Sequence, residues 1–369
     1  MKITCSQSEL LKGVNTVLKA VPTRTTMAIL ECILIDATGE EIKLTANDME
    51  IGIETRISGT IEEKGVIAID ARLFGDIINT CPNNSVTIEC DDKYQTLITC
   101  EESKVNIIGK PGDDFSNIPV IPRNEPLIIS QLTLKDLIRQ TTFTISEANA
   151  NNKMMTGELM EITGDNLKMV ALDKYRISIR NIKLKDSYPD KKVIIPGKTL
   201  NEIAKIMSGG SEDRVEIYFT DNHIIFEFDK TTVVSRLIEG EFINIDHMIS
   251  NDYETKVKVN KSNLSEEIHG MTVILNRDPE NKPFIMDIKE GNMEIRINST
   301  IAKREGKIAV EKDGKDLVIG FNPKLFNDAL KAIDDEDVTL YLVNHRSPCF
   351  IKDDEGSYIY VILPVNIQE

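Results

Sequence analysis

Apolar residues recur along the chain at two spacings, and these spacings predict a few helices separated by many short strands. A spacing of three or four residues, as in Leu10, Val14, Val17 and Leu18, places apolar side chains on one face of a helix. Strict alternation of apolar and polar residues is typical of strands with one buried face. Helices are predicted over residues 6–20, 71–81, 131–146, 197–209, 261–275 and 323–333.

The same pattern occurs three times. Residues 70–78, 196–204 and 322–330 place apolar side chains at equivalent positions, and each segment begins 126 residues after the previous one. Each unit begins with a short strand and a helix, and its second helix lies between two groups of strands. A period this long indicates similar domains in a row rather than a solenoid. We therefore predict an α+β fold with three domains, 1–122, 123–250 and 251–369, each with two helices backed by antiparallel sheets.

The composition is that of an ordinary folded protein. Of the 369 residues, 41% are hydrophobic and 28% are charged, which excludes a disordered chain. The longest strongly apolar run, 358–365, is far shorter than the roughly 20 residues that span a bilayer. Residues 1–3 are followed at once by polar residues, so no secretory signal is visible. We expect a cytoplasmic protein whose six scattered cysteines are reduced and mostly buried.

The net charge of −16 argues against a nucleic-acid partner, because phosphate binding needs positive charge. The charge is unevenly distributed, however. The helical segments (7–20, 71–81, 131–146, 197–209, 261–275 and 322–333) hold ten basic and seven acidic residues, whereas the remainder holds 34 and 53. A solvated polar helix face would explain one such segment. Recurrence at equivalent places favours a surface that attracts phosphates, although Glu266 and Glu267 depart from the pattern.

Basic residues seven positions apart share one helix face, opposite the apolar stripe. These pairs are Lys12 with Lys19, Lys198 with Lys205, and Lys324 with Lys331; Lys135 and Arg139 lie four residues apart on another helix. Lysines and arginines attract DNA phosphates without reading sequence. We interpret these residues as candidate contacts to duplex DNA.

Domain size constrains the assembly that such helices could line. A domain of about 120 residues has a radius of gyration near 14 Å and is roughly 35 Å across. Three such domains in a triangle leave almost no opening, whereas six in a hexagon leave about 35 Å, enough for a duplex on the order of 20 Å wide. Six domains require two chains, which can close head to tail about a two-fold axis.

The whole chain resembles the bacterial DNA polymerase III beta subunit family, the sliding clamps. The similarity rests on the three-unit layout, on 22–30 with its Ile-Leu ending, on the 171–176 turn, on 320–322 and on the terminal segment 360–365. The resemblance implies a homodimeric ring that encircles duplex DNA and slides. Such a ring tethers the replicative polymerase, confers processivity, and has no catalytic residues and no cofactor of its own.

The resemblance also implies a hydrophobic pocket between the second and third domains. Short motifs of the replicative polymerase, the clamp loader and repair proteins would dock there, as suits an apolar cleft that contains methionine. The matching positions are Met155, Leu172, Lys174, Tyr175, Arg176, Ile177, Ile243, His247, Met248, Ser347, Pro348, Val361, Leu363, Pro364 and Val365. Leu172, Lys174, Tyr175 and His247 depart from the family's pattern, which bears on partner preference. The alternative for the last residues is an ordinary alternating strand.

Two further sets of positions follow from the resemblance. Arg24 and Lys153 match family positions near the DNA. The subunit seam would lie between the first and third domains, where Val105 and Ile107 on an edge strand would meet Ile274 and Leu275. An unpaired edge strand is a pairing site that ring closure would cover.

Motifs for catalysis are not visible in the sequence. There is no phosphate-binding glycine loop, and the four histidines lack metal-ligand spacing, so we predict no metal site. Two other functions remain open at this stage. The chain could be a three-domain protein-binding scaffold that does not encircle DNA, or an enzyme whose active site is assembled between repeats.

Overall fold

The chain forms two compact units, each built from segments that are distant in sequence. The computed structural model describes residues 1–116, 118–119, 121–146, 152–275, 277 and 282–367. One unit combines Met1–Leu134 with Glu202–Leu237, and the other combines Lys135–Asn201 with Ile238–Glu369. The second of the three sequence repeats therefore contributes to both units.

Two antiparallel sheets make up the first unit. A five-stranded sheet has the order β5 (Thr60–Glu63), β1 (Lys2–Ser6), β7 (Ser85–Cys90), β8 (Gln95–Cys100) and β9 (Ser103–Ile108). A nine-stranded sheet has the order β10 (Lys110–Pro111), β6 (Val66–Asp70), β2 (Cys32–Asp36), β3 (Ile42–Asn47), β4 (Ile51–Ile57), β16 (Thr231–Arg236), β15 (His223–Phe228), β14 (Arg214–Phe219) and β11 (Leu127–Ser130).

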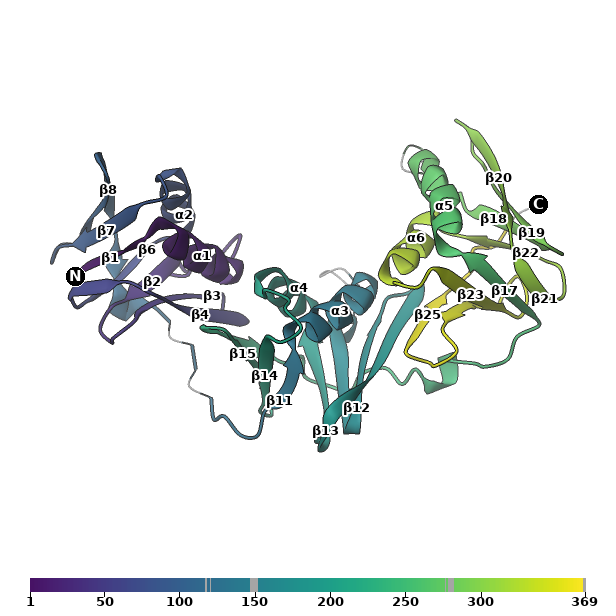
Figure 1. Cartoon of the computed structure of the whole chain (residues 1–369), viewed down its shortest axis with the longest axis horizontal. Coiled ribbons are helices and arrows are strands. Elements are labelled where there is room, and N and C mark those ends of the chain that lie inside the picture. The colour runs from purple at the N-terminus through teal and green to yellow at the C-terminus, as the bar shows by residue number, and fades with distance from the viewer. Residues whose placement is uncertain (117, 120, 147–151, 276, 278–281, 368–369) are drawn as a thin grey trace. The chain divides into compact units, whose positions relative to one another are not determined.

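Helices α1 (Gln7–Val17) and α2 (Ala71–Thr80) pack against each other and on these sheets (Figure 1). The Ser6 hydroxyl accepts a hydrogen bond from a backbone N–H in the first turn of α1, which satisfies one of the free donors at the helix start. Gly13 lets α1 approach the sheet closely, because a β-carbon there would lie 2.6 Å from the Ile57 side chain. Lys12 of α1 is left exposed.

The nine-stranded sheet joins strands from two sequence repeats. Strand β4 of the first repeat pairs antiparallel with β16 of the second, with Ile53 opposite Val233. The hydroxyls of Thr55 and Thr231 lie 2.8 Å apart across the same pair of strands. Backbone hydrogen bonds thus join the first repeat to the second within one sheet.

The second unit has the same construction. A seven-stranded sheet has the order β12 (Gly157–Leu172), β13 (Arg176–Pro196), β25 (Tyr358–Ile362), β24 (Cys349–Lys352), β23 (Asp337–Leu342), β17 (Thr255–Asn260) and β21 (Glu311–Gly314). A four-stranded sheet has the order β20 (Lys303–Ala309), β19 (Asn292–Asn298), β18 (Phe284–Lys289) and β22 (Leu317–Phe321). Strand β13 of the second repeat pairs with β25 of the third.

Helices α5 (Lys261–Leu275) and α6 (Pro323–Ala332) pack on each other within this unit. Asn322 caps α6, since its side-chain oxygen accepts from the backbone N–H groups of Lys324 and Leu325, and Pro323 occupies the first helical position. Phe326 of α6 is fully buried against other aromatic rings from β18 and β22. These contacts explain the apolar stripe that the sequence places on this helix.

Three helices are shorter than the sequence predicts. Helix α3 (Gln131–Thr141) ends where the hydroxyls of Thr141 and Thr142 donate to carbonyl oxygens four residues earlier, and a short 3₁₀ turn, Thr142–Thr144, follows. Helix α4 (Gly197–Ile206) ends before Gly209, whose positive φ of 85° does not fit a helix. Helix α1 ends at Val17 and is followed by a 3₁₀ turn, Leu18–Ala20, whereas the other three predicted helices agree closely with the structure.

The burial of the cysteines and the length of the helices both bear on predictions made from the sequence. All six cysteines are free in the structure, and Cys5, Cys32, Cys100 and Cys349 are buried, which confirms that most of them are buried. Burial raises the pKa of Cys5 to about 12. In the described part of the chain, no helix combines the length and the apolar character needed to cross a membrane.

Candidate functional site

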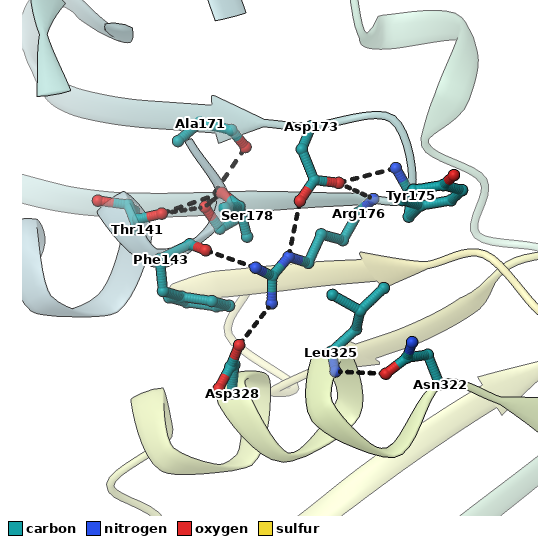
Figure 2. Close-up of polar contacts among 11 residues, drawn as sticks. Thr141, Phe143, Ala171, Asp173, Tyr175, Arg176, Ser178, Asn322, Leu325 and Asp328 are labelled. Atoms are coloured by element: carbon teal, nitrogen blue, oxygen red, sulfur yellow. Dashed lines mark hydrogen bonds and ion pairs between the residues drawn. The ribbon is translucent and has the colours of Figure 1, made fainter. Parts of the chain in front are cut away.

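A tight turn between β12 and β13 carries several of the residues assigned to the pocket. Asp173 shapes the turn, since its Oδ1 accepts hydrogen bonds from the backbone N–H groups of Tyr175 at 2.7 Å and Arg176 at 3.0 Å. The turn leaves Lys174 and Tyr175 exposed, with 57% of Tyr175 accessible. Figure 2 shows Tyr175 and Arg176 leaving this turn in different directions.

Arg176 is held by three different elements of the second unit. Its Nε donates to Asp173 at 3.0 Å, its Nη1 donates to Asp328 of α6 at 2.9 Å, and its Nη2 donates to the Phe143 carbonyl at 2.7 Å (Figure 2). The guanidinium also lies 5.3 Å from the centroid of the Phe143 ring. Only 11% of the Arg176 side chain is exposed. Arg176 therefore ties the second repeat to the third.

Five of the apolar residues assigned to the pocket lie in one cluster. Leu172, Ile177 and Val361 are buried together, and Met155 and Ile243 pack against them partly exposed. Because β13 and β25 are paired, Ile177 stands directly opposite Val361. The structure brings these five predicted residues together from strands and connections that are distant in the sequence.

Several assigned residues next to this cluster keep exposed apolar surface. Tyr175, Met248, Leu363 and Val365 are each exposed by a third or more, and the backbone N–H of Leu363 donates to the Tyr175 carbonyl at 2.8 Å. Exposed apolar side chains beside a buried apolar cluster are the usual surface for a short peptide. The tail then turns away, since the Val365 N–H donates to the carbonyl of Gly320 on β22.

The remaining assigned residues border this region. His247 lies on a short 3₁₀ turn, Asp246–Met248, and is exposed. Ser347 and Pro348 are half-buried just before β24, whose first residue pairs with the last residue of β25. Pro364 is half-buried after that strand. These four residues lie on loops.

Sequence reasoning missed several residues of this region. Phe143, Asp173 and Asp328 hold Arg176, and Phe242 and Ile245 complete the apolar cluster. The Asp-x-x-Arg spacing of the turn could have indicated the ion pair between Asp173 and Arg176, which are three residues apart. No local signal connects Asp328 with Arg176, because 152 residues separate them.

The candidate DNA contacts lie mostly on helices and are mostly exposed. Exposed examples are Lys12 on α1, Arg139 on α3, Lys198 and Lys205 on α4, Lys324 and Lys331 on α6, and Arg24 and Lys153 elsewhere; Lys19 and Lys135 are half-buried. Helices α4 and α6 therefore present lysines at matching positions of the second and third repeats, and Lys12 lies on α1, the first helix of the first repeat. The described fold leaves these charges accessible to a phosphate backbone.

Arg139 and Lys205 are among the basic residues that pair with acidic groups. Arg139 donates to Asp334 at 2.6 Å and lies 3.4 Å from Asp136. Lys205 lies 2.8 Å from Glu202, one turn earlier on the same helix. Ion pairing offsets part of the charge of Arg139 and Lys205, so each offers less net attraction to DNA than Lys12 or Lys324.

The assigned seam residues differ in exposure. Leu275 is buried within the core of its own unit, Ile107 is 8% exposed, and Ile274 and Val105 are half-buried. The most exposed apolar residues on the same two elements are Ile108, at 73%, and Val273, at 51%. Strand β9 is the last strand of its sheet, and so is β20 of its own. Val105 and Ile107 thus lie on an edge strand, as the sequence pattern predicts. The larger solvent-exposed apolar area, however, belongs to Ile108 and Val273.

Titratable groups form no metal centre in the described residues: they include no cluster of three or more His, Cys, Asp or Glu side chains placed to hold an ion. One buried acid stands out. Glu158, at the start of β12, is fully buried, and neither carboxyl oxygen has a hydrogen-bond partner among the described residues. Burial raises the pKa of Glu158 to about 8.

Three comparisons with known proteins agree. The sequence matches domain families described as DNA polymerase III beta subunit, N-terminal domain, over residues 1–119, central domain over 128–244, and C-terminal domain over 247–366. A curated beta sliding clamp of Staphylococcus epidermidis is 32% identical over 378 residues, covering 99% of each chain.

Solved structures extend this similarity to the fold. A crystal structure of a putative DNA polymerase III beta subunit from Eubacterium rectale is 60% identical, with a TM-score of 0.96 and full coverage of both chains. A crystal structure of the DNA polymerase sliding clamp from Bacillus subtilis is 30% identical, with a TM-score of 0.94 and the same coverage. The resemblance inferred from the sequence is confirmed over the full length of the chain.

Proposed function

The chain belongs to the DNA polymerase III beta subunit family, the sliding clamps that make DNA polymerases processive, and we propose that two copies close into a ring around duplex DNA. The ring would contain six domains, three from each chain, at 1–122, 123–250 and 251–369. The observation that carries the proposal is the presence of exposed lysines on helices α1, α4 and α6, at matching positions of α4 and α6, in a chain of net charge −16. Such a charge division attracts phosphates to the helices and repels them elsewhere.

Ring closure would use the two sheet edges. Strand β9 ends the five-stranded sheet and β20 ends the four-stranded sheet, so each has backbone groups available for a strand of another copy. Ile108 and Val273 would add apolar contact beside the predicted residues Val105, Ile107, Ile274 and Leu275. In a head-to-tail pair of copies, each seam uses one β9 edge and one β20 edge, so neither of these two edges stays open.

Partner proteins would dock on the surface formed by the 173–176 turn and the end of β25. Its buried apolar cluster and exposed Tyr175, Met248 and Leu363 suit short apolar motifs of the replicative polymerase, the clamp loader and repair proteins. The chain itself would act by topology and docking, without catalysing a reaction and without a cofactor. We propose that it works in the cytoplasm, where bacterial DNA is replicated.

Topology gives the decisive experiment. The protein is loaded onto nicked circular DNA with a clamp loader, and the DNA is then cut once. We expect the protein to stay on the circle and to leave the linear form through its ends. Retention on linear DNA with open ends would contradict encirclement.

Charge reversal tests the part played by the helices. Lys12→Glu, Lys198→Glu and Lys205→Glu together should shorten retention on circular DNA and reduce processivity, since each lost phosphate contact lowers the salt slope of binding by about 0.9. The matched control reverses Lys183, Lys185 and Lys192, which are exposed on β13 rather than on helices. Equal processivity of both variants and the wild type would favour a protein-binding scaffold instead.

A further inference from the structure

The first unit contains a groove that neither the proposed ring nor the proposed docking surface uses. Its volume is about 260 Å³, and it lies beside the turn between β3 and β4. Met49, at the tip of this turn, has a positive φ of 75° and exposes 54% of its surface. Ile118, Pro119 and Val234 complete an apolar lining. A flexible, exposed methionine beside an apolar groove suits a side chain of a partner.

The turn beside this groove is built like the turn beside the proposed docking surface. Asp48 Oδ1 accepts from the backbone N–H groups of Glu50 at 2.9 Å and Ile51 at 2.7 Å, as Asp173 does for the second and third residues after it. The backbone N–H of Asp48 donates to the Ile51 carbonyl at 3.1 Å, and that of Asp173 donates to the Arg176 carbonyl at 3.0 Å. The two turns therefore have the same pattern of hydrogen bonds.

The adjoining strands repeat the arrangement. The backbone N–H at the end of β16, in Arg236, donates to the Glu50 carbonyl at 2.9 Å; after β25, that of Leu363 donates to the Tyr175 carbonyl at 2.8 Å. In both places a strand of one repeat pairs with the last strand of the next. The internal repeat has thus produced two surfaces of the same construction, one in each unit.

The floor of the groove is set by a glycine. A β-carbon at Gly52 would lie 2.7 Å from the Ile118 side chain, so only glycine lets this linker side chain lie on β4. Ile118 in turn packs against an apolar cluster that includes Val234 and Ile225. The groove is therefore a built feature, held between the linker and the joined strands.

One wall of the groove is cationic. Arg236 and His223 stand opposite each other on β16 and β15, and Val234 shares their sheet face two residues away. In the described structure neither the guanidinium nor the imidazole has a hydrogen-bond or ion-pair partner. Burial and the Arg236 charge lower the pKa of His223. Glu50, whose carbonyl accepts from the Arg236 N–H, also lines the groove.

We propose that this groove is a second peptide-docking site, which takes an apolar side chain of a partner protein next to a carboxylate. The apolar side chain would lie between Met49, Ile118 and Val234, and the carboxylate would bind Arg236 and His223. The volume suits one or two side chains rather than a large ligand. The comparison of the two turns draws on the proposed docking function, whereas the groove and its charges stand independently of it.

Methionine methyl groups allow both surfaces to be followed in one titration. The protein is labelled with [¹³C-methyl]methionine, and the Met49 and Met248 resonances are assigned with Met49→Leu and Met248→Leu. The probes are acetyl-Gly-Leu-Glu-Leu-Gly-amide and the same peptide with Lys in place of Glu. We expect the Met49 resonance to shift saturably, with the Glu peptide binding at least about threefold more tightly than the Lys peptide.

Variants separate charge recognition from general effects. Arg236→Gln should abolish the preference for the Glu peptide, and Arg72→Gln, an exposed control on α2, should retain it. A Met49 resonance that does not move, or moves equally with both peptides, overturns the proposal, and this comparison needs only wild-type protein. A shift of Met248 alone would overturn the second site and leave the proposed docking surface intact. A shift of Met49 alone would support the second site and show that this probe does not bind the proposed docking surface.

Discussion

The Arg176 guanidinium forms an ion pair with the Asp328 carboxylate, with 2.9 Å between Nη1 and Oδ2. Arg176 lies at the start of β13 in the second repeat, and Asp328 lies on α6 in the third. The pair therefore joins two repeats beside the strand pairing of β13 with β25. Sequence reasoning did not connect Arg176 with Asp328, although it assigned Arg176 to the peptide pocket.

Removing this ion pair should destabilise the second unit. In Asp328→Asn, the largely buried Arg176 charge loses its strongest distant partner but keeps Asp173, so we expect a loss of about 1–3 kcal/mol in the free energy of unfolding. The measurement is urea denaturation. The matched control is Asp165→Asn, which breaks an exposed pair with Lys183 and should cost less than about 1 kcal/mol. Equal losses in both variants would contradict a joining role for Arg176.

The seam should depend on exposed rather than buried residues. Ile108→Asp with Val273→Ala removes the most accessible apolar area from the two elements, so we expect more monomer at nanomolar concentration and an unchanged unfolding transition of the monomer. Leu275→Ala, by contrast, should cost about 2–5 kcal/mol of folding stability because that side chain is buried. Sedimentation and urea denaturation distinguish the two effects.

Met27→Asp is the control for the seam, since Met27 is an exposed apolar residue of the first unit outside β9. It should leave the mass in solution at twice 41.5 kDa. A dimer that survives nanomolar dilution in the Ile108→Asp, Val273→Ala protein would show that the seam lies elsewhere.

Exposed residues of the proposed docking surface should affect binding and not folding. Met248→Ala with Leu363→Ala should weaken the binding of a peptide from the replicative polymerase by tenfold or more, on the order of 1.4 kcal/mol, because half-exposed apolar side chains are available to a ligand. Fluorescence anisotropy measures the affinity. Ile301→Ala, an equally exposed residue of the same unit, is the control, and an unaltered affinity in the double variant would refute the assignment.

Glu158 should make stability depend on pH. Its pKa is raised from 4.5 to about 8 in the folded protein, so between these values the folded state holds a proton that the unfolded state has lost. The free energy of unfolding should therefore fall as the pH rises from about 5 to 8, by up to about 1.4 kcal/mol per pH unit from this group. Above the folded-state pKa this contribution stays constant.

Glu158→Gln removes the titrating proton and keeps the shape of the side chain. The variant should be less sensitive to pH than the wild type over the same range, as measured by urea denaturation at pH 6, 7, 8 and 9. Wild-type and variant curves that run parallel would show that Glu158 does not control the dependence.

Much of the site could be predicted from the sequence where local pattern carried the information. The alternation of Val361, Leu363 and Val365 indicated a strand with one apolar face, but β25 ends at Ile362, so Leu363 and Val365 lie beyond the strand and are exposed. Exposure could not be predicted as well. Leu275 and Ile108 are both apolar and both lie at element ends, yet one is 6% and the other 73% exposed. Exposure depends on which neighbours pack there, and those neighbours are far away in the sequence.

The sequence by itself determined the threefold repeat, the helix positions and the lysines on their polar faces, because hydrophobic periodicity and capping act over a few residues. Only the tertiary structure decided that β4 pairs with β16 and β13 with β25, that Arg176 meets Asp328, and that Gly52 accommodates Ile118. Strand pairing and ion pairing between distant segments depend on how the chain folds back on itself, and no local pattern of residues specifies that partner.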